Sequence, residues 1–463
     1  MSTGGVGIPV QPFERGLSDD RGEARRAAGA RSLTRLAMTG TAWTLLGHAG
    51  AQVMRIGSHL VLAWLLDPAV FGVMVMVDVV LQGLKMVSDV GTGPSIVQHE
   101  RGDDPDFLDT AWTVQVMRHG GLFVLACLMA WPVAMYRGQD QLMILLPVAA
   151  ISALLGGLRS TAPATLHRHL ELRTLTLFEL SMQVIRSGTT IALAFYLRNV
   201  WALVLGAIAG SAVTLIASHT VIAKRRNRFC WDRDAVGHLF RFGRWIFIAT
   251  GLTFVCSQGD KLILAGFLSD GQLGLYGIAV LLAMAVPQAL REVTNRVLFP
   301  VYSRIARQPA HLLRGKIMRS RLLLQLATVP VLCVLAIGGR EIVTLLYPER
   351  YHGVAWMLQL LAMGAVFRVV ELTMSPVLLA SGDSFRHMLA LVSQSVLMVA
   401  AMVIGGATEG LFGLVAGIAI APVLNYPVLA WAVKRYGVWM PWFDAAFMLA
   451  AAMSITAGTV WLS

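Results

Sequence analysis

The chain has 463 residues, of which 56% are hydrophobic and only 14% are charged, and this composition excludes a set of soluble domains. The apolar residues come in runs of about twenty, the length with which an α-helix crosses roughly 30 Å of hydrocarbon, whereas a β-barrel would show alternating segments of about ten. The formal charge of +12 is spread over membrane-proximal loops, which indicates membrane topology and argues against a nucleic-acid partner.

The first 35 residues are polar, mixed in charge and rich in Gly, Ala and Arg. They contain no apolar core of the kind that a cleaved signal peptide has. We therefore expect residues 1–35 to form a disordered cytosolic tail.

Apolar runs bounded by charges or turn residues predict the membrane helices in chain order. In the first half they lie at residues 36–66, 70–91, 108–135, 141–166, 173–197 and 200–222. After a polar linker at 223–237, the second half has runs at 238–268, 272–301, 322–347, 354–380, 385–405 and 411–433. A thirteenth run, 442–461, lies in the final segment 435–463. The predicted fold is all-α and polytopic, with six-helix bundles at 36–222 and 238–434 and at least one extra C-terminal helix.

Lysine and arginine indicate the orientation, because positive charges are retained on the cytosolic side. Alternate loops, starting with the N-terminal tail, hold most of the basic residues, including those at 224–228 and 304–319. The intervening turns hold little beyond Arg137, Arg198 and Arg350. The N-terminus is therefore predicted to be cytosolic, and a thirteenth span would place the C-terminus outside.

The two halves of the chain also resemble each other. Residues 60–74, LVLAWLLDPAVFGVM, align without gaps on residues 262–276, LILAGFLSDGQLGLY, and residues 200–210 echo residues 411–421. Chance similarity among apolar helices is the alternative explanation, but the placement is equivalent in both halves. Six helices return the chain to the same side, so a duplication predicts parallel repeats about an axis along the membrane normal.

The first helix carries a polar stripe at steps of three and four, which places its members on one face. These residues are Thr41, Thr44, His48, Gln52, Arg55 and His59. An arginine at the bilayer centre costs roughly 2.5 to 3.5 kcal/mol even on the insertion scale. The stripe should therefore face water, ligand or polar partners; a stripe that only bonds to neighbouring helices is the alternative.

Other intramembrane charges follow the same reasoning. The second helix carries Asp78, Gln82, Lys85 and Asp89 on one face, and its two flanking acids suggest that Lys85 is partly paired. Further cations are Arg118, Arg186, Lys261 beside Asp260, and Arg291 and Arg296, which lie toward the cytosolic end where lipid phosphates could also attract them. Arg368 and Glu371, one turn apart, are more typical of a structural salt bridge.

Several segments carry a resemblance to a known family. They are LAWLLDPAVFGVMVMVDVV, SDVGTGPSIVQ, GDKLILAGFLSDGQLGLYGIAVLLAMAVPQ and LFPVYSRIAR. Over about residues 36–433 the chain resembles the polysaccharide-transporter, or Wzx-type flippase, branch of the multidrug/oligosaccharidyl-lipid/polysaccharide exporter superfamily. The resemblance implies two lobes around a central cavity lined largely by helices 1, 2, 7 and 8. It also implies undecaprenyl-pyrophosphate-linked oligosaccharide as cargo, while the uncertain C-terminal helix count departs from the family's usual even number.

The intramembrane cations suit a pyrophosphate, and the neighbouring amides, imidazoles and hydroxyls suit sugar hydroxyls. We expect a flippase that carries oligosaccharide repeat units from the cytosolic to the periplasmic leaflet of the bacterial inner membrane by alternating access, for exopolysaccharide or lipopolysaccharide biosynthesis. Predicted substrate-binding residues are Arg55, His48, Gln52, Lys85, Arg118, Arg186, Lys261, Arg291 and Arg296; candidates for ion coupling are Asp78, Asp89 and Asp260. Membrane lipids, a polysaccharide polymerase and the export machinery are the further partners considered.

Three other functions stay open at this point. An efflux carrier of the same superfamily is disfavoured for cationic drugs because the predicted cavity is cationic, whereas lipid II would use the same arginines. A membrane polysaccharide polymerase or ligase resembles multi-helix proteins with a large external loop, and every external turn predicted here is short.

Motifs for catalysis or energy supply are weak. Asp104 with Asp106, and Asp232 with Asp234, match the DxD pattern of glycosyltransferases, but both lie in short loops without room for a nucleotide-binding domain. The one Gly-Lys pair, at residues 315–316, lacks the upstream glycine of an ATP-binding loop. The four cysteines have neither metal-ligand nor CxxC spacing and are interpreted as packing residues. We therefore expect no enzymatic activity, no metal ion and no cofactor.

Overall fold

The computed structural model describes residues 17–89, 91–223, 225–305 and 310–462, and within these ranges the chain is all-helical, without a strand. The helices of the first half are α1 (Leu17–Leu65), α2 (Pro68–Val87), α3 (Thr92–Gln98), α4 (Pro105–Arg137), α5 (Gln141–Gly157), α6 (Ala162–Arg168), α7 (Leu172–Leu197) and α8 (Val200–Ala217), which continues as a π-helical turn, η1 (Ser218–Ile222). Proline in the first turn begins both α2 and α4, because its missing N–H is one that a helix start leaves unbonded anyway.

The second half begins with α9 (Arg233–Phe267), α10 (Asp270–Ala283), α11 (Ala285–Val293), the π-helical η2 (Thr294–Leu298) and α12 (Phe299–Ile305). It continues with α13 (Ala310–Ile337), α14 (Gly339–Leu346), the short η3 (Glu349–Tyr351), α15 (Val354–Ala380), α16 (Ser384–Lys434) and α17 (Pro441–Leu462). The span named α16 is two helices that meet at Gly410, whose φ of 56° is tolerated by glycine. Gly405 and Gly413 then lie in backbone contact across this hairpin.

Each predicted apolar run lies on one of these helices or on consecutive helices, so the all-α polytopic membrane fold is confirmed. Among the described residues, six helices are individually long and apolar enough to cross a membrane, or up to eight if each bent pair is one span. The bent pairs are α5 with α6, at 50°, and α10 with the helical segment that follows it, at 42°. Helices α1 and α7 are outside this set, and α1 includes stretches of polar residues that lower its hydropathy.

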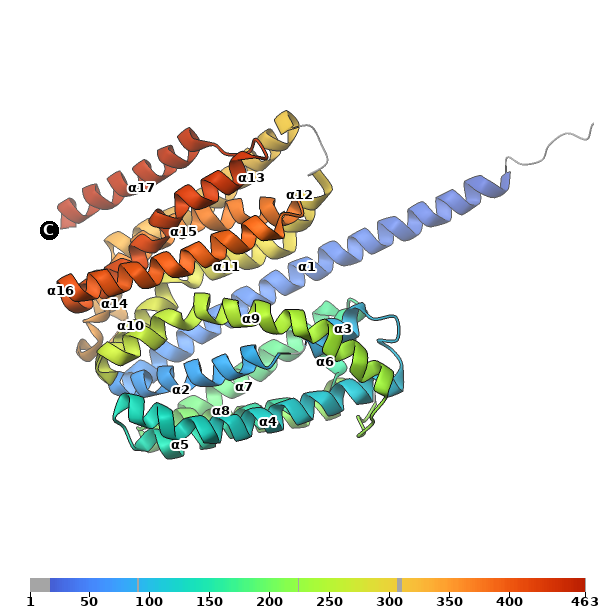
Figure 1. Ribbon diagram of the computed structural model, residues 1–463, viewed down its shortest axis with the longest axis horizontal. Coiled ribbons are helices and arrows are strands. Elements are labelled where there is room, and N and C mark those ends of the chain that lie inside the picture. Colours follow the sequence, from blue (N-terminus) through green and yellow to red (C-terminus); the bar gives the residue numbers. More distant parts are fainter. Residues whose placement is uncertain (1–16, 90, 224, 306–309, 463) are drawn as a thin grey trace, which may run out of the picture.

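Helix α1 already begins at Leu17, inside the segment 1–35 that the sequence predicts to be a disordered tail. The sequence of this stretch, LSDDRGEARRAAGARSLTR, explains the difference. Ala, Arg and Leu, which recur in this stretch, are strong helix formers. Residues 1–16 lie outside the described part of the chain. Figure 1 shows α1 running between the two halves and extending beyond the bundle at its N-terminal end.

Glycines let α1 pack closely on α7. A Cβ atom at Gly47 would lie 2.4 Å from the Thr176 methyl group, and one at Gly40 would lie 2.7 Å from Leu172. Small residues at such contacts are typical of helix pairs in membranes, where close van der Waals packing replaces the hydrophobic drive. In Figure 1, α2, α4 and α5 lie in the lower part of the view, and α13, α15 and α17 lie in the upper part.

A buried ion pair attaches the last helix to the second half. The Arg321 guanidinium on α13 pairs with the Asp444 carboxylate on α17, and both side chains are at most 1% exposed. Asp444 also accepts from the Tyr426 hydroxyl at 2.9 Å, and Arg321 Nε donates to the Thr373 hydroxyl at 3.3 Å. Helix α17, the predicted thirteenth membrane helix, is therefore an integral part of the fold.

Candidate functional site

Arg55 lies where the polar face of α1 meets the second half of the chain. Its Nη2 donates to Oε1 of Gln52, one turn earlier, and to Oε1 of Gln288 on α11 at 3.0 Å. Two ring nitrogens on the same helix, His48 Nε2 and His59 Nδ1, are buried without a hydrogen-bond partner among the described residues. Arg55 thus has neutral amide partners and no acidic one in the described part of the chain. The Thr41 side chain lies outside that part.

A mixed group of charges lies between α2 and α9. Asp78 lies in the middle of α2, and its side chain is exposed. The charges of Lys85 on α2 and Lys261 on α9 both act on this carboxylate. Lys261 Nζ also donates to Gln258 Oε1 at 2.9 Å. Its neighbour Asp260 accepts from the Tyr276 hydroxyl at 2.5 Å. Because α9 belongs to the second half, these predicted residues from both halves lie together.

The predicted cations Lys85, Arg118 and Arg186 share one electrostatic neighbourhood, which also contains Arg159. Arg118 forms an ion pair with Asp89 at 2.7 Å, so a predicted ligand and a predicted ion-coupling residue are joined to each other. Sequence reasoning missed Arg159. The signal was available, because this arginine lies within the predicted fourth membrane helix, where a charge is costly.

The break between α5 and α6 places Arg159. Three side chains hold the carbonyl groups that the break leaves without helical partners: Gln115 Nε2 donates to the Gly157 carbonyl at 2.8 Å, Trp112 Nε1 donates to the Leu158 carbonyl at 3.3 Å, and His219 Nε2 lies 3.0 Å from the same oxygen. The broken helix is thus a built feature. Interrupted membrane helices of this kind often mark binding sites in transporters.

The end of the predicted eighth span that follows α11 carries the last predicted cations. Arg296 lies in η2 and pairs with Glu292 one turn earlier at 2.8 Å, with 37% of the arginine side chain exposed. Its charge also acts on Glu179 of α7, across the boundary between the halves. Arg291 is exposed at the end of α11. A π-helical turn within a membrane helix is a feature found frequently at functional sites.

At the opposite end of the helices, the two halves are joined by polar contacts. Arg137, which ends α4, donates to the Leu268 carbonyl at 3.1 Å and pairs with Asp270 at 2.6 Å. Gln139 donates to the other Asp270 oxygen at 2.5 Å. The side chain of Arg137 is only 7% exposed, so this ion pair is largely removed from water.

A second arginine makes the corresponding contact from the other half. Arg350, in η3, donates to the carbonyls of Ala63 and Trp64 at 3.0 and 2.9 Å. Tyr351 donates to the Leu66 carbonyl at 2.7 Å. The turn after the first membrane helix of each half is therefore held by an arginine that follows the third membrane helix of the other half. The sequence predicts that this end of the helices faces the periplasm, and we therefore call the contacts from Arg137 and Arg350 the outer contacts.

Glycines complete the outer contacts where α2 crosses α10. A Cβ atom at Gly72 would lie 1.9 Å from the Asp270 carbonyl oxygen, and one at Gly274 would lie 1.9 Å from the Pro68 carbonyl oxygen. In the predicted repeat, Gly274 corresponds to Gly72 and Asp270 corresponds to Pro68. The contact is thus reciprocal, as a two-fold relation between the repeats requires.

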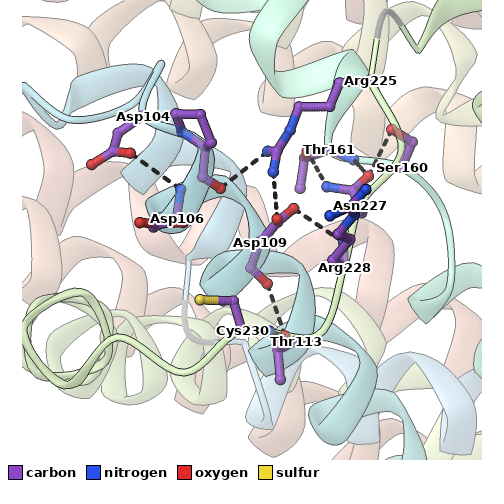
Figure 2. Close-up of polar contacts among 11 residues, drawn as sticks. Asp104, Asp106, Asp109, Thr113, Ser160, Thr161, Arg225, Asn227, Arg228 and Cys230 are labelled. Carbon is purple, nitrogen blue, oxygen red and sulfur yellow. Dashed lines mark hydrogen bonds and ion pairs between the residues drawn. The ribbon is translucent and has the colours of Figure 1, made fainter.

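The linker between the halves, which the sequence predicts to be cytosolic, is attached to α4. Figure 2 shows the buried carboxylate of Asp109 accepting from the Arg225 side chain at 2.5 Å and from the Arg228 backbone N–H at 3.1 Å. The Cys230 backbone N–H donates to the Thr113 hydroxyl at 3.1 Å, one turn further along α4. The described linker residues therefore follow the first half up to the start of α9.

The two DxD sequences have a structural explanation. Asp104 and Asp232 cap the N-termini of α4 and α9, accepting from the backbone N–H groups of Asp106 and Asp234 at 3.1 and 2.9 Å. Arg101 forms ion pairs with both caps. Its hydrogen bond holds the pKa of Asp104 below the usual value, and the Asp234 N–H does the same for the pKa of Asp232. Both carboxylates are thus already used to start helices.

The sequence matches the family described as polysaccharide biosynthesis protein over residues 61–356, more than half of its length. The chain belongs to the polysaccharide-transporter, or Wzx-type, family. It is 23% identical to the lipopolysaccharide biosynthesis protein WzxC of Escherichia coli K12, over 89% of this chain and 86% of that protein. It is also 23% identical to the teichuronic acid biosynthesis protein TuaB of Bacillus subtilis 168, over 76% of this chain and 72% of the relative.

Two solved structures share the fold of this chain. The lipid II flippase MurJ in an inward closed conformation superposes with a TM-score of 0.70 at 13% identity, covering 91% of this chain and 92% of MurJ. An inward-facing multidrug transporter of the MATE family gives a TM-score of 0.59 at 14% identity, covering 90% of this chain and 95% of that one. At such identities the likeness shows the fold alone.

Proposed function

We propose that this Wzx-type transporter is a flippase for a saccharide linked to a polyprenyl pyrophosphate, and that it moves this cargo from the cytosolic to the periplasmic leaflet of the bacterial inner membrane. The observation that carries the proposal is the set of intramembrane cations without acidic partners among the described residues, at Arg55, Arg159 and Arg186. A cationic lining suits an anionic head group and disfavours cationic drugs. The names of the relatives, which refer to lipopolysaccharide and teichuronic acid, support a cell-surface saccharide as cargo.

The contacts on the outer side fit such a cycle. With the outer ends of α2 and α10 held together, cargo would enter from the cytosolic side, and release would require the outer contacts to part. No ATP-binding sequence is found, so transport would follow the gradient of the cargo or of an ion. Asp78 is the acid best placed for ion coupling, because it lies within range of lysines from both halves.

Arg55 provides the direct test of the cargo site. It lies ten residues before α1 ends at Leu65, hence roughly 15 Å from that end and deep in the membrane. A charge-assisted contact contributes about 1.5 to 3 kcal/mol, so we expect Arg55→Ala to weaken head-group binding roughly ten- to a hundredfold. Arg55→Lys should keep part of the activity, because the charge remains while the bidentate fork is lost.

The measurement is transfer of a fluorescent polyprenyl-pyrophosphate oligosaccharide across proteoliposome membranes that contain the full chain. We expect the wild-type protein to expose the cargo to a membrane-impermeant quencher, and Arg55→Ala to do so far more slowly at equal protein content. A wild-type protein that moves no such lipid would overturn the proposed function. A normal rate for Arg55→Ala would remove only Arg55 from the site.

The orientation is tested at Cys230, which lies in the linker attached to α4. Because basic residues gather in this loop, we expect Cys230 to be cytosolic. In a variant that keeps Cys230 as its one cysteine, an impermeant thiol reagent should label the protein in permeabilised cells and leave it unlabelled in intact cells. A cysteine introduced at Asp140, on the opposite side, is the positive control. Labelling of Cys230 in intact cells would reverse the orientation.

A further inference from the structure

A cavity of about 270 Å³ lies within the first half of the chain, between the α5–α6 break, α7 and the end of α8. Two arginines line it, Arg159 from the break and Arg186 from α7, together with Gln183 and Thr214. Apolar side chains, including Phe178 and Met182, form the rest of the wall. Pockets for small ligands usually measure about 300 to 1,000 Å³, so this cavity suits a head group and not a whole lipid-linked oligosaccharide.

Both arginines are held in place by the fold. The stem of Arg186 packs on α8 at Gly210, where a Cβ atom would lie 2.7 Å from the arginine Cγ. The backbone at Arg159 is held at the helix break, because Gln115 Nε2 donates to the Arg159 carbonyl at 3.3 Å. The cavity is therefore a preformed site and not a chance gap between side chains.

The charges in this cavity are unbalanced. The Arg159 and Arg186 charges act on each other, and Lys85 lies within electrostatic range of both. Among the described residues neither arginine has an acidic partner, and the Nε atom of each is buried without a hydrogen bond. Glu179 also lines the cavity, but the opposite charge that acts on it is that of Arg296. Two guanidinium groups that line the same half-buried cavity repel each other, and an anion between them would remove the repulsion.

We propose that this cavity binds the phosphate groups of a polyprenyl pyrophosphate, with Arg159 and Arg186 as paired ligands. The proposal rests on the proposed function and names where its head group is held. Guanidinium groups match phosphate oxygens in bidentate geometry. The apolar wall next to the cations favours a lipid whose phosphate is joined directly to a hydrocarbon chain over a phospholipid, whose phosphate is joined to glycerol.

The test measures binding of farnesyl pyrophosphate to the purified full chain in detergent by isothermal titration calorimetry. We expect Arg159→Gln and Arg186→Gln each to raise Kd roughly ten- to a hundredfold, and Arg186→Lys to raise it less. Arg173→Gln is the matched control, because Arg173 lies on the same helix and stacks on Trp43, with 5.5 Å from its guanidinium carbon to the ring centre, outside the cavity. Equal affinity in the cavity variants and the wild type, or equal loss in Arg173→Gln, would overturn the proposal.

Two further probes identify the source of the phosphate. Farnesol, which lacks phosphate, should not bind, and phosphatidylglycerol should compete at least tenfold less well than farnesyl pyrophosphate. Equal competition by phosphatidylglycerol would overturn the assignment to a prenyl lipid, because the cavity would then hold a bilayer head group. Failure of the proposed function can be distinguished from failure of this site. If only the function is wrong, the wild type moves no lipid-linked saccharide, but the cavity variants still bind farnesyl pyrophosphate more weakly than the wild type does.

Discussion

Gly274→Ala is expected to stop transport almost completely, although it adds a single methyl group. The new Cβ atom would lie 1.9 Å from the Pro68 carbonyl oxygen, and a backbone atom cannot move aside as a flexible side chain can. Overpacking of this kind costs typically 1 to 3 kcal/mol, and relief requires α2 and α10 to separate. The closed outer side would then lose roughly ten- to a hundredfold in population relative to states in which the two helices are apart.

The reciprocal contact makes the prediction symmetric. Gly72→Ala should have the same effect, because its Cβ atom would meet the Asp270 carbonyl oxygen at the same distance. The matched control is Gly271→Ala, where an added Cβ atom has open space on the same helix. Alanine is favoured over glycine within a helix by about 1 kcal/mol, so the control should be neutral or slightly stabilised.

The measurement combines transport with labelling from outside the cell. Leu66 is 1% exposed beneath the outer contacts, so a cysteine at this position in a cysteine-free protein should resist an impermeant thiol reagent. Gly72→Ala and Gly274→Ala should make it reactive, while Gly271→Ala should not. If both glycine variants transport cargo and resist labelling as Gly271→Ala does, the close contact between α2 and α10 is not needed for transport.

Asp444→Ala is expected to be the most destabilising single change outside the transport site. It would leave the Arg321 guanidinium buried and unpaired, which typically costs 3 to 5 kcal/mol. Replacing both partners with apolar residues of similar volume removes the buried charge as well, and such exchanges are often neutral or stabilising. The double variant Arg321→Met, Asp444→Leu should therefore recover most of the stability that Asp444→Ala loses.

Thermal unfolding of the purified protein, followed by size-exclusion chromatography after heating, measures this effect. Asp140→Ala serves as the control, because Asp140 is exposed and makes no side-chain cap bond. A melting temperature for Asp444→Ala equal to that of the control would contradict the prediction. So would a double variant as unstable as the single one, since the loss would then come from packing and not from the unpaired charge.

The sequence by itself determined the membrane class, the positions of the apolar helices and the residues with costly intramembrane charges. The physical reason is that backbone polar groups in hydrocarbon must be bonded within their own helix, so each span needs a continuous apolar run. The same rule marked Arg55, Lys85 and Arg186 as residues that should face a polar site. The repeat around Gly72 and Gly274 could also be found from the sequence, because the two segments align without gaps and lie at equivalent positions in the two halves.

Only the tertiary structure decided which of these charges are paired. The approach of Asp89 to Arg118, of Gln288 to Arg55 and of Arg137 to Asp270 depends on helix packing between segments far apart in the chain. Periodicity assigns a face to a helix but not the neighbour that the face meets. The same limit hid Arg159, whose role depends on a helix break held by side chains from α4 and η1. The extension of α1 to Leu17 was missed for the opposite reason, because local helix propensity outweighed the polar composition that had suggested disorder.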